Sequence, residues 1–190
     1  MNNDQITRNS DERLCTIDHL NRLDSFIRKI AHNPRRLLKP FIKEGMSVMD
    51  LGCGGGFATI ALAEMVGGKG EVIAADVQEE MLAITKERVK KSGLSDRVSF
   101  HRCSSTKIGY DGKLDFVLAF YMLHETGNIP SFLEDIYGIL ENGGLLYVSE
   151  PTFHVSPEEF SFTQEEAEKA GFTIFSLPKV LFGRSAVFKK

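Results

Sequence analysis

A cluster of glycines near residue 52 is the feature of this sequence most suited to chemistry. Gly52, Gly54, Gly55 and Gly56 stand within five consecutive positions, directly after the largely apolar residues 46–51. Glycine adopts positive φ angles freely and lets a ligand approach the backbone closely. Where such a loop leads into a helix, the N–H groups of the first turn add the positive end of a dipole. The cluster therefore predicts a ligand-binding loop.

An aspartate at the end of the next apolar stretch is the second signal. Residues 72–76 read Val-Ile-Ala-Ala-Asp, which is an apolar strand that ends in Asp76. An acid at the tip of the second strand can accept two hydrogen bonds from ribose hydroxyls. Together, the glycine loop and Asp76 predict a ligand that contains a nucleoside. The alternative is a structural turn followed by a helix-capping aspartate.

The spacing of the glycines separates classes of nucleoside ligand. The dinucleotide fingerprint G-x-G-x-x-G requires a glycine at position 57, where this sequence has Phe57. Asp50, just before the loop, would repel a pyrophosphate but suits a cationic ligand. The sequence has no G-x-x-x-x-G-K-[ST] motif, so a phosphate-binding P-loop is excluded. An oxidoreductase that uses NAD stays open as the alternative from another enzyme class.

Short apolar stretches alternate with helical segments from residue 45 onward, which is typical of βαβ units and a parallel sheet covered on both faces. The predicted strands are residues 46–51, 71–76, 98–103, 114–120 and 145–150. The predicted helices between them are residues 57–66, 78–92 and 130–141. Ser156 begins a further helix that Gly171 ends, and residues 172–177 and 184–188 suit an antiparallel hairpin at one sheet edge. We therefore expect an α/β fold with a doubly wound, mostly parallel sheet.

Composition and charge indicate one globular domain. The chain has 190 residues, 42% of them hydrophobic, and a formal net charge of −3. This charge argues against nucleic-acid binding over the whole surface. No apolar run is long enough to span a bilayer, and the polar N-terminus is no signal peptide, so we expect a cytoplasmic protein. Cys15, Cys53 and Cys103 lack the spacing of a disulfide framework or zinc site, and we expect free thiols and no metal.

The order of these motifs resembles that of the class I S-adenosylmethionine-dependent methyltransferases. Residues 50–56 are similar to the first motif of that family, and residues 72–76 are similar to its second. Residues 114–120 and 142–148 are similar to its fourth- and fifth-strand segments, so the resemblance covers about residues 36–190. It implies a Rossmann-like seven-stranded sheet whose last two strands form the hairpin. It also implies S-adenosylmethionine as cofactor and S-adenosylhomocysteine as product.

The resemblance implies cofactor contacts at the positions that match the family's motifs. The loop glycines would lie under the methionine part of the cofactor, Asp50 near its ammonium group, and Asp76 on both ribose hydroxyls. The family often has an acid for the adenine amine after the third strand, where this sequence has two serines. A serine hydroxyl or a backbone carbonyl would have to serve there, and Val77 would pack on the adenine. The complete implied set is Asp50, Gly52, Cys53, Gly54, Gly56, Asp76, Val77, Ser104, Ser105 and Phe120.

Absent motifs narrow the class of methyl acceptor. Residues 119–122 replace the [DN]-P-P-[YF] run of enzymes that methylate adenine or amide nitrogens. No cysteine nucleophile for cytosine methylation lies nearby, and Phe120 stands where metal-dependent catechol-type enzymes place aspartates. We therefore expect a small-molecule acceptor. Methylation of RNA or protein, and cofactor binding without catalysis, stay open as alternatives, as do a monomer and a homodimer.

A base is needed only if the acceptor must lose a proton. The polar residues expected at the carboxyl edge of the sheet are Tyr121, His124, Glu125, Glu150 and His154. His124 is first interpreted as a packed, hydrogen-bonded histidine. Glu150 ends a predicted strand and His154 lies in a predicted loop. Each is a weak candidate, and the sequence assigns a catalytic role to none of them.

The first 44 residues differ from the rest because basic residues outnumber acidic ones there. Apolar residues at helical spacing predict an amphipathic helix over residues 17–31. Asn33 and Pro34 are a good start for a second, short helix through about residue 41. We expect residues 1–44 to form a helical lid over the acceptor and residues 45–190 to form the methyltransferase domain. A solvated basic face is favoured over contact with an anionic acceptor.

Overall fold

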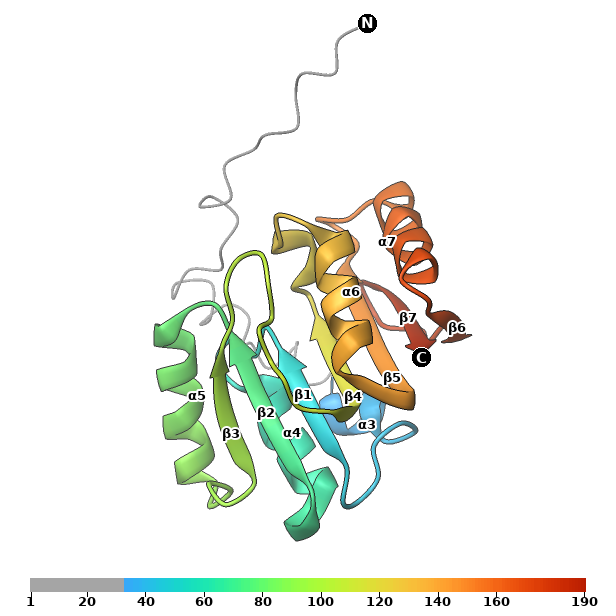
Figure 1. Cartoon of the computed structure of the whole chain (residues 1–190). Coiled ribbons are helices and arrows are strands. Elements are labelled where there is room, and N and C mark those ends of the chain that lie inside the picture. Colours follow the sequence, from blue (N-terminus) through green and yellow to red (C-terminus); the bar gives the residue numbers. More distant parts are fainter. Residues whose placement is uncertain (1–32) are drawn as a thin grey trace, which may run out of the picture.

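The computed structural model describes residues 33–190, which form a seven-stranded sheet covered by helices on both faces (Figure 1). The strand order is β3-β2-β1-β4-β5-β7-β6. Strands β1 to β5 are parallel, whereas β7 pairs antiparallel with both β5 and β6. This is the predicted doubly wound sheet with its antiparallel hairpin. The elements in chain order are α3 Pro34–Leu38, β1 Ser47–Leu51, α4 Phe57–Val66, the 3-10 turn η2 Gly67–Lys69, β2 Glu71–Asp76, α5 Glu79–Lys91, β3 Val98–Arg102, β4 Leu114–Phe120, the 3-10 turn η3 Leu123–Glu125, α6 Ile129–Ile139, β5 Leu140–Pro151, α7 Pro157–Lys169, β6 Thr173–Ser176 and β7 Gly183–Lys189.

Each face of the sheet carries its own hydrophobic core. One core holds Phe132 of α6 and Phe160 of α7. The other holds Leu38 of α3, Leu62 of α4 and Val89 of α5. The helices therefore divide into two layers, with α6 and α7 on one face and α3, α4 and α5 on the other.

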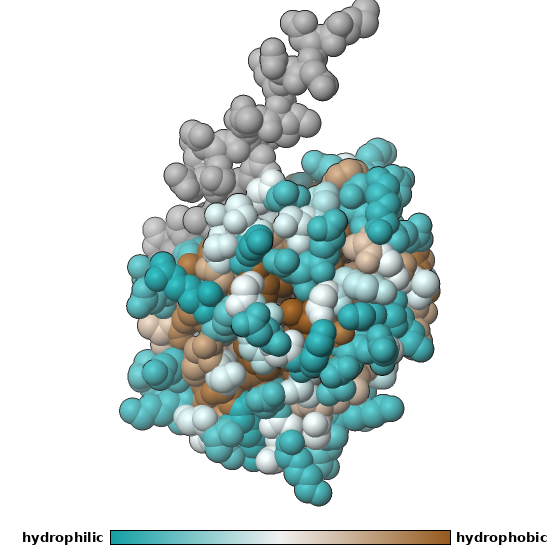
Figure 2. All heavy atoms as spheres, viewed as in Figure 1, coloured by the Kyte–Doolittle hydropathy of each residue, from teal (hydrophilic) through white to brown (hydrophobic). Residues whose placement is uncertain are grey.

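The inner strands are apolar on both sides because both of their faces are covered. Val48 and Met49 are neighbours in β1 and are both fully buried, yet they belong to different cores. Continuous apolar runs are what this arrangement requires, and they produced the strand predictions. On the outside, polar side chains cover most of the face seen in Figure 2, with apolar residues visible between them near its centre.

The predicted bounds of β2, β4 and α4 agree with the structure, but the start of β5 was predicted wrongly. The helix predicted to reach residue 141 ends at Ile139, and β5 begins at Leu140 rather than at residue 145. Leu140 adopts an extended conformation and pairs with Leu114 before the register of β4 and β5 shifts. Gly143 takes a positive φ of 86° inside this stretch, which explains why its composition favoured a turn.

Helix α3 begins at the predicted residues. The Asn33 side chain accepts a hydrogen bond from the backbone N–H of Arg36 at 3.4 Å, and Pro34 occupies the first turn. The helix ends at Leu38, a few residues before the predicted end. The helix predicted over residues 17–31 lies outside the described residues, as does Cys15. Within residues 33–190, no helix is long and apolar enough to cross a membrane.

Candidate active site

The glycine loop lies between the end of β1 and the start of α4. Gly52, Gly54 and Gly56 all have positive φ angles, at 71°, 50° and 78°. The backbone N–H groups of Gly52 and Cys53 both donate to the carbonyl of Ala75 in β2, at 2.8 and 3.0 Å. The loop is therefore held against the carboxyl end of β2, and its glycine content follows from its backbone conformation.

Asp76 connects this loop to the end of β2. Its Oδ2 accepts a hydrogen bond from the N–H of Gly54, and its Oδ1 accepts one from the N–H of Gln78, both at 2.9 Å. The residue is only 7% exposed, and burial raises the pKa of its carboxyl group. A carboxylate has about four lone-pair positions, so Asp76 can accept further hydrogen bonds from a diol. Its two N–H partners thus fix the orientation of the carboxylate, and its role in binding ribose stays a prediction.

Asp50 lies beneath the loop and is almost fully buried. Its Oδ2 accepts a hydrogen bond from the Thr59 hydroxyl at 2.5 Å. Burial is the largest cause that raises its pKa to about 6, and the negative charge of Asp76 raises it further. A buried carboxylate beside a second one favours a cation in the space near them. This charge pattern suits the ammonium and sulfonium groups of the cofactor that the motifs imply.

Two residues of α5 complete the loop and were not predicted from the sequence. The Thr85 hydroxyl donates to the carbonyl of Gly54 at 2.6 Å, and Arg88 Nη1 donates to that of Gly55 at 2.7 Å. The carbonyls of Gly54 and Gly55 are thereby paired with side chains of α5, which fixes the loop against that helix. Thr85 and Arg88 stand three residues apart, so the sequence places them on one face of the helix. That spacing does not indicate that this face contacts the glycine loop.

The surroundings of the loop glycines differ from one another. A Cβ added at Gly54 would meet nothing within 4 Å. One added at Gly52 would lie 2.7 Å from the Cβ of Met122, and one at Gly56 would lie 2.9 Å from a methyl carbon of Thr85. Two glycines are thus required by protein packing, whereas Gly54 faces open space. The donors, acids and open space at this position match what S-adenosylmethionine requires.

The remaining expected cofactor residues differ in environment. Val77 is half-buried and packs against the core on the α6 face. Ser104 is exposed, and its hydroxyl oxygen accepts a hydrogen bond from the N–H of Lys107 at 2.9 Å, so it stabilises its own turn. Ser105 is also exposed. Cys53 is buried, and burial raises the pKa of its thiol far above the ordinary range, which makes it a packing residue.

Phe120 lines a small apolar pocket beside the loop. The other residues that line it come from α3, α4 and the sheet: Pro34, Leu37, Leu38, Phe57, Ala58, Leu118 and Tyr147. The Phe120 ring stacks on that of Tyr121, with ring centroids 4.4 Å apart. Tyr121 has a positive φ of 61°, and its hydroxyl donates to the carbonyl of Phe182 at 3.3 Å. An aromatic wall therefore continues from the cofactor loop toward the β6–β7 connection.

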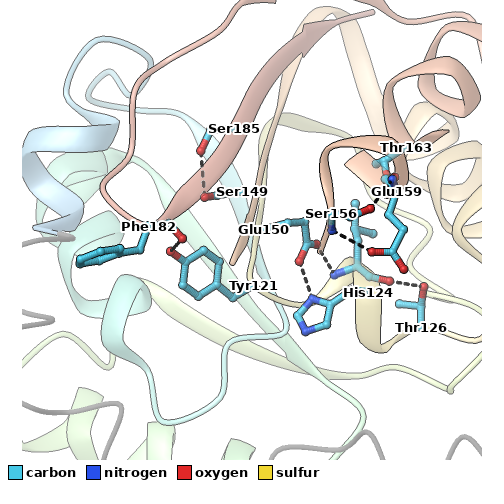
Figure 3. A network of polar contacts seen from close by, with 11 residues as sticks. Tyr121, His124, Thr126, Ser149, Glu150, Ser156, Glu159, Thr163, Phe182 and Ser185 are labelled. Atoms are coloured by element: carbon cyan, nitrogen blue, oxygen red, sulfur yellow. Dashed lines mark hydrogen bonds and ion pairs between the residues drawn. The ribbon is translucent and has the colours of Figure 1, made fainter. Parts of the chain in front are cut away.

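The carboxyl ends of β4 and β5 bring His124 and Glu150 together (Figure 3). His124 Nδ1 contacts Glu150 Oε2, while Glu150 Oε1 accepts a hydrogen bond from the N–H of Leu123 at 2.9 Å. Glu150 is 1% exposed. The His154 ring stacks against that of His124, with ring centroids 5.7 Å apart. Tyr121 stands in the same segment as His124, and its N–H donates to the carbonyl of Ser149 in β5 at 2.7 Å. Four of the five polar candidates thus belong to one region, and their contacts were not predicted.

Glu125 is the fifth member of this region. Burial raises the pKa of its carboxyl group to about 7. The charges of Glu150 and Asp76 raise it as well, whereas that of His124 lowers it. Glu125 therefore interacts electrostatically with the His124–Glu150 pair and with Asp76 at the end of β2.

Exposed apolar side chains border the same region. Phe153, Leu181 and Phe182 are 72%, 57% and 58% exposed. The N–H of Thr152 donates to the carbonyl of Phe182 at 3.0 Å, which joins the β5–α7 connection to the β6–β7 connection. We refer to Phe153, Leu181 and Phe182 as the apolar rim. Such a rim favours an apolar molecule at the entrance to the site.

Comparison with known proteins agrees with this architecture. A family model described as a methyltransferase domain matches residues 42–178. The chain is 30% identical to a SAM-dependent methyltransferase from Aquifex aeolicus whose crystal structure is known, with a TM-score of 0.82 over 93% of this chain and 98% of that one.

Curated relatives share the same domain. Demethylmenaquinone methyltransferase from Anoxybacillus flavithermus is 28% identical over 177 residues, which span 80% of this chain and 75% of the relative. The enzyme of that name from Bacteroides fragilis is 31% identical over 141 residues, which span 73% of this chain and 52% of the relative. The chain thus spans only about half the length of the second relative. On the family model and the structural match, the chain belongs to the class I S-adenosylmethionine-dependent methyltransferases.

Proposed function

We propose that this methyltransferase transfers the methyl group of S-adenosylmethionine to a ring carbon of a small apolar acceptor of the reduced-quinone class. The observation that carries the proposal is the position of the apolar rim, which borders the polar groups at the ends of β4 and β5. Two relatives named for demethylmenaquinone support the same class of acceptor.

The cofactor supplies a methyl group that is already activated by its sulfonium. The glycine loop and Asp76 would bind and orient it, and Asp50 would face its ammonium group. When a ring carbon accepts the methyl group, a C–C bond forms, the C–S bond breaks, and the ring C–H proton must leave. The residues of the site therefore need to align the two reactants and to accept one proton.

The aromatic wall suits a flat acceptor. The stacked rings of Phe120 and Tyr121 extend from the cofactor loop, and the Phe182 carbonyl fixes the Tyr121 hydroxyl. A bicyclic ring packs favourably on such a surface, and an apolar tail would follow the rim toward solvent. This arrangement favours a small ligand over a folded RNA or a protein.

The role of the N-terminal region is inferred from the position of α3. α3 contributes Pro34, Leu37 and Leu38 to the pocket that Phe57 and Phe120 also line. Helix α3 therefore lies beside the cofactor loop. We infer that residues 1–44 form a lid over the acceptor and that residues 45–190 form the methyltransferase domain.

The test uses the full chain, methyl-labelled S-adenosylmethionine and a chemically reduced demethylated naphthoquinone with a short prenyl chain. We expect one S-adenosylhomocysteine per methylated quinol, with the label on a ring carbon by mass spectrometry. Total cellular RNA, a peptide pool and catechol serve as competing acceptors. Label in RNA, in peptides or on a catechol oxygen would overturn the proposal, as would cofactor binding without any transfer.

A further inference from the structure

We propose that His124 accepts the proton that the acceptor loses during methyl transfer, and that Glu150 is the positioning residue that holds it. The proposal rests on the proposed function, because methylation at a ring carbon releases one proton. The C–H bond breaks after the new C–C bond forms, its electron pair returns to the ring, and the proton passes to the imidazole. The positive charge that the sulfonium loses is thus carried by His124 until solvent takes the proton.

The geometry fixes which nitrogen does this. Glu150 uses its two oxygens for different partners, with Oε1 on the N–H of Leu123 and Oε2 on His124 Nδ1. Because a carboxylate only accepts, Nδ1 carries the hydrogen and Nε2 presents a lone pair. The imidazole ring is therefore held in the tautomer whose Nε2 can take up a proton.

The segment that carries His124 lies directly on the cofactor loop. Residues 120–125 connect β4 to η3, and Met122 packs so closely on Gly52 that no Cβ fits between them. The N–H of Tyr121 donates to the carbonyl of Ser149 at 2.7 Å, which ties the segment to β5. His124 is thus attached at both sides, to the loop through Met122 and to β5 through Glu150. A base held in this way needs no movement to meet an acceptor beside the cofactor.

The surrounding charges favour a protonated imidazole. Glu150 contacts the ring from β5, and Glu125 lies next to it in η3. Asp76 adds negative charge from β2 through its interaction with Glu125. The groups on the other sides are His154, which stacks on the ring, and Arg184 of β7, which stands opposite Glu150 in the strand register. The Glu150 carboxylate contacts the ring directly, so its negative charge can stabilise the proton that His124 would accept.

A packed histidine without a chemical role is the competing explanation. A side chain that only fills space needs no carboxylate, and burying one costs several kcal/mol unless it is paired. Here Glu150 is 1% exposed and is paired on both oxygens, and one of its partners is the half-buried His124 at the edge of the site. The contact between His124 and Glu150 is therefore better explained by an effect of the carboxylate on the proton affinity of the imidazole.

The first experiment measures the imidazole itself and needs no acceptor. The pH titration of His124 is followed by NMR in the full chain and in Glu150→Gln, which keeps the size and the acceptor oxygen but removes the charge. Loss of a contacting carboxylate should lower the pKa of His124 by about one unit or more. An unchanged titration would overturn the pairing.

The second experiment measures turnover with whichever acceptor yields S-adenosylhomocysteine in the test above. His124→Gln should lower kcat by roughly 10²- to 10⁴-fold and leave the affinity for S-adenosylmethionine within about threefold. His101→Gln is the matched control, because His101 is also partly buried, with its Nε2 hydrogen-bonded to the carbonyl of Ile108 at 2.6 Å, but outside the site. It should keep its kcat within about threefold, as expected for loss of one ordinary hydrogen bond.

The pH profile separates a base from a structural histidine. A base works unprotonated, so kcat should rise with pH through the pKa of His124 and then level off. In Glu150→Gln this rise should move to lower pH, and the plateau should fall because a weaker base takes the proton less well. The inference is overturned if His124→Gln keeps its kcat, or if Glu150→Gln leaves the rise in place. Methylation of RNA in place of the quinol would overturn the proposed acceptor alone, since the same variants then test the base on RNA. A chain that methylates nothing would overturn both.

Discussion

The candidate sites in the two halves of the sheet are built in different ways. In the half that contains β1, β2 and β3, the candidate cofactor site consists mainly of backbone: three glycines with positive φ and an aspartate that accepts hydrogen bonds from two N–H groups. In the half that contains β4, β5 and β7, the site consists of side chains such as His124 and Glu150, which lie 26 positions apart in the chain.

This difference explains why the family motifs imply cofactor contacts in the first half, whereas they assign no catalytic role to residues in the second. A backbone site needs glycines at fixed positions, so its sequence is constrained and can be recognised. A side-chain site depends on which residues the strands bring together, and many sequences can provide a similar surface. On the proposed function, the first half would determine the class of reaction and the second half its acceptor.

The largest effect should come from Asp76. Asp76→Ala removes both carboxylate oxygens, and two hydrogen bonds from ribose to a charged group are worth about 1.5–3 kcal/mol each. Affinity for S-adenosylmethionine, measured by calorimetry, should fall at least about a hundredfold. Because Asp76 also binds the N–H groups of Gly54 and Gln78, Asp76→Asn serves as a second variant that keeps part of the loop contacts. Unchanged affinity in both variants would contradict the ribose assignment.

The contact between the two halves is tested by a pair of glycine substitutions. In Gly52→Ala the new Cβ would lie 2.7 Å from the Cβ of Met122, so overpacking adds to the strain of a positive φ. We expect a loss of about 2–4 kcal/mol in the free energy of unfolding. In Gly54→Ala only the strain applies, at about 1–2 kcal/mol, because nothing lies within 4 Å.

Cofactor affinity should separate the same two variants. The alanine at position 54 would enter the space left for the ligand, so Gly54→Ala should weaken cofactor binding more than its small loss of stability suggests. Chemical denaturation and calorimetry measure the two quantities. Equal losses of stability in Gly52→Ala and Gly54→Ala would show that Met122 does not pack tightly against the glycine loop.

Substitution of Asp50 should have a smaller effect, and it should raise the stability of the folded chain, whereas the glycine substitutions lower it. Its pKa is raised to about 6 from 3.8, so the folded chain holds a proton that the unfolded chain has released between these pH values. Its contribution to stability is therefore present below about pH 4 and is lost as the pH rises through 6. Asp50→Asn should stabilise the cofactor-free chain at pH 7 by about 1–3 kcal/mol.

The same substitution should weaken the binding of S-adenosylmethionine. Without a carboxylate to face the ammonium group, Asp50→Asn should bind S-adenosylmethionine more weakly, and the affinity of the unchanged chain should rise between pH 5 and 7. The difference in stability between the two chains should vanish near pH 4. A variant that is less stable at pH 7 would show that Asp50 is a structural residue only.

The smallest effect concerns the apolar rim. Phe182→Ser removes an aromatic side chain beside Tyr121, and the KM for a prenylated quinol should rise about fivefold, as expected for the loss of about 1 kcal/mol of apolar contact. Phe175→Ser is the matched control, because Phe175 is 55% exposed against 58% for Phe182 but lies on the edge strand β6. Equal effects of the two substitutions on KM would remove the rim from the acceptor site.

Local sequence patterns were sufficient for most of the fold. The bounds of β2, β4 and α4 followed from apolar runs between glycine-rich turns, and the capping box at Ser156 marked the start of α7. The start of β5 was missed because Gly143 and Gly144 favour a turn, whereas Leu140 pairs with Leu114 of β4 and the N–H of Gly143 donates to the carbonyl of Lys190. Tertiary pairing overrides local propensity there.

Candidate residues could be named from the sequence where motif spacing marks them, as it does for Asp50, Asp76 and the glycines. The pairing of His124 with Glu150, and the support of the loop by Thr85 and Arg88, depend on how distant elements pack, which spacing does not record. Both members of the pair were named as candidates, but only the structure relates them.

The division of work between the two halves is tested most directly by measuring cofactor affinity and turnover in the same two variants, Asp76→Asn and His124→Gln. We predict that Asp76→Asn binds S-adenosylmethionine at least about tenfold more weakly. We predict that His124→Gln binds it within about threefold of the unchanged chain but loses turnover by roughly a hundredfold or more. Loss of affinity and turnover in equal measure in His124→Gln, or unchanged affinity in Asp76→Asn, would contradict this division.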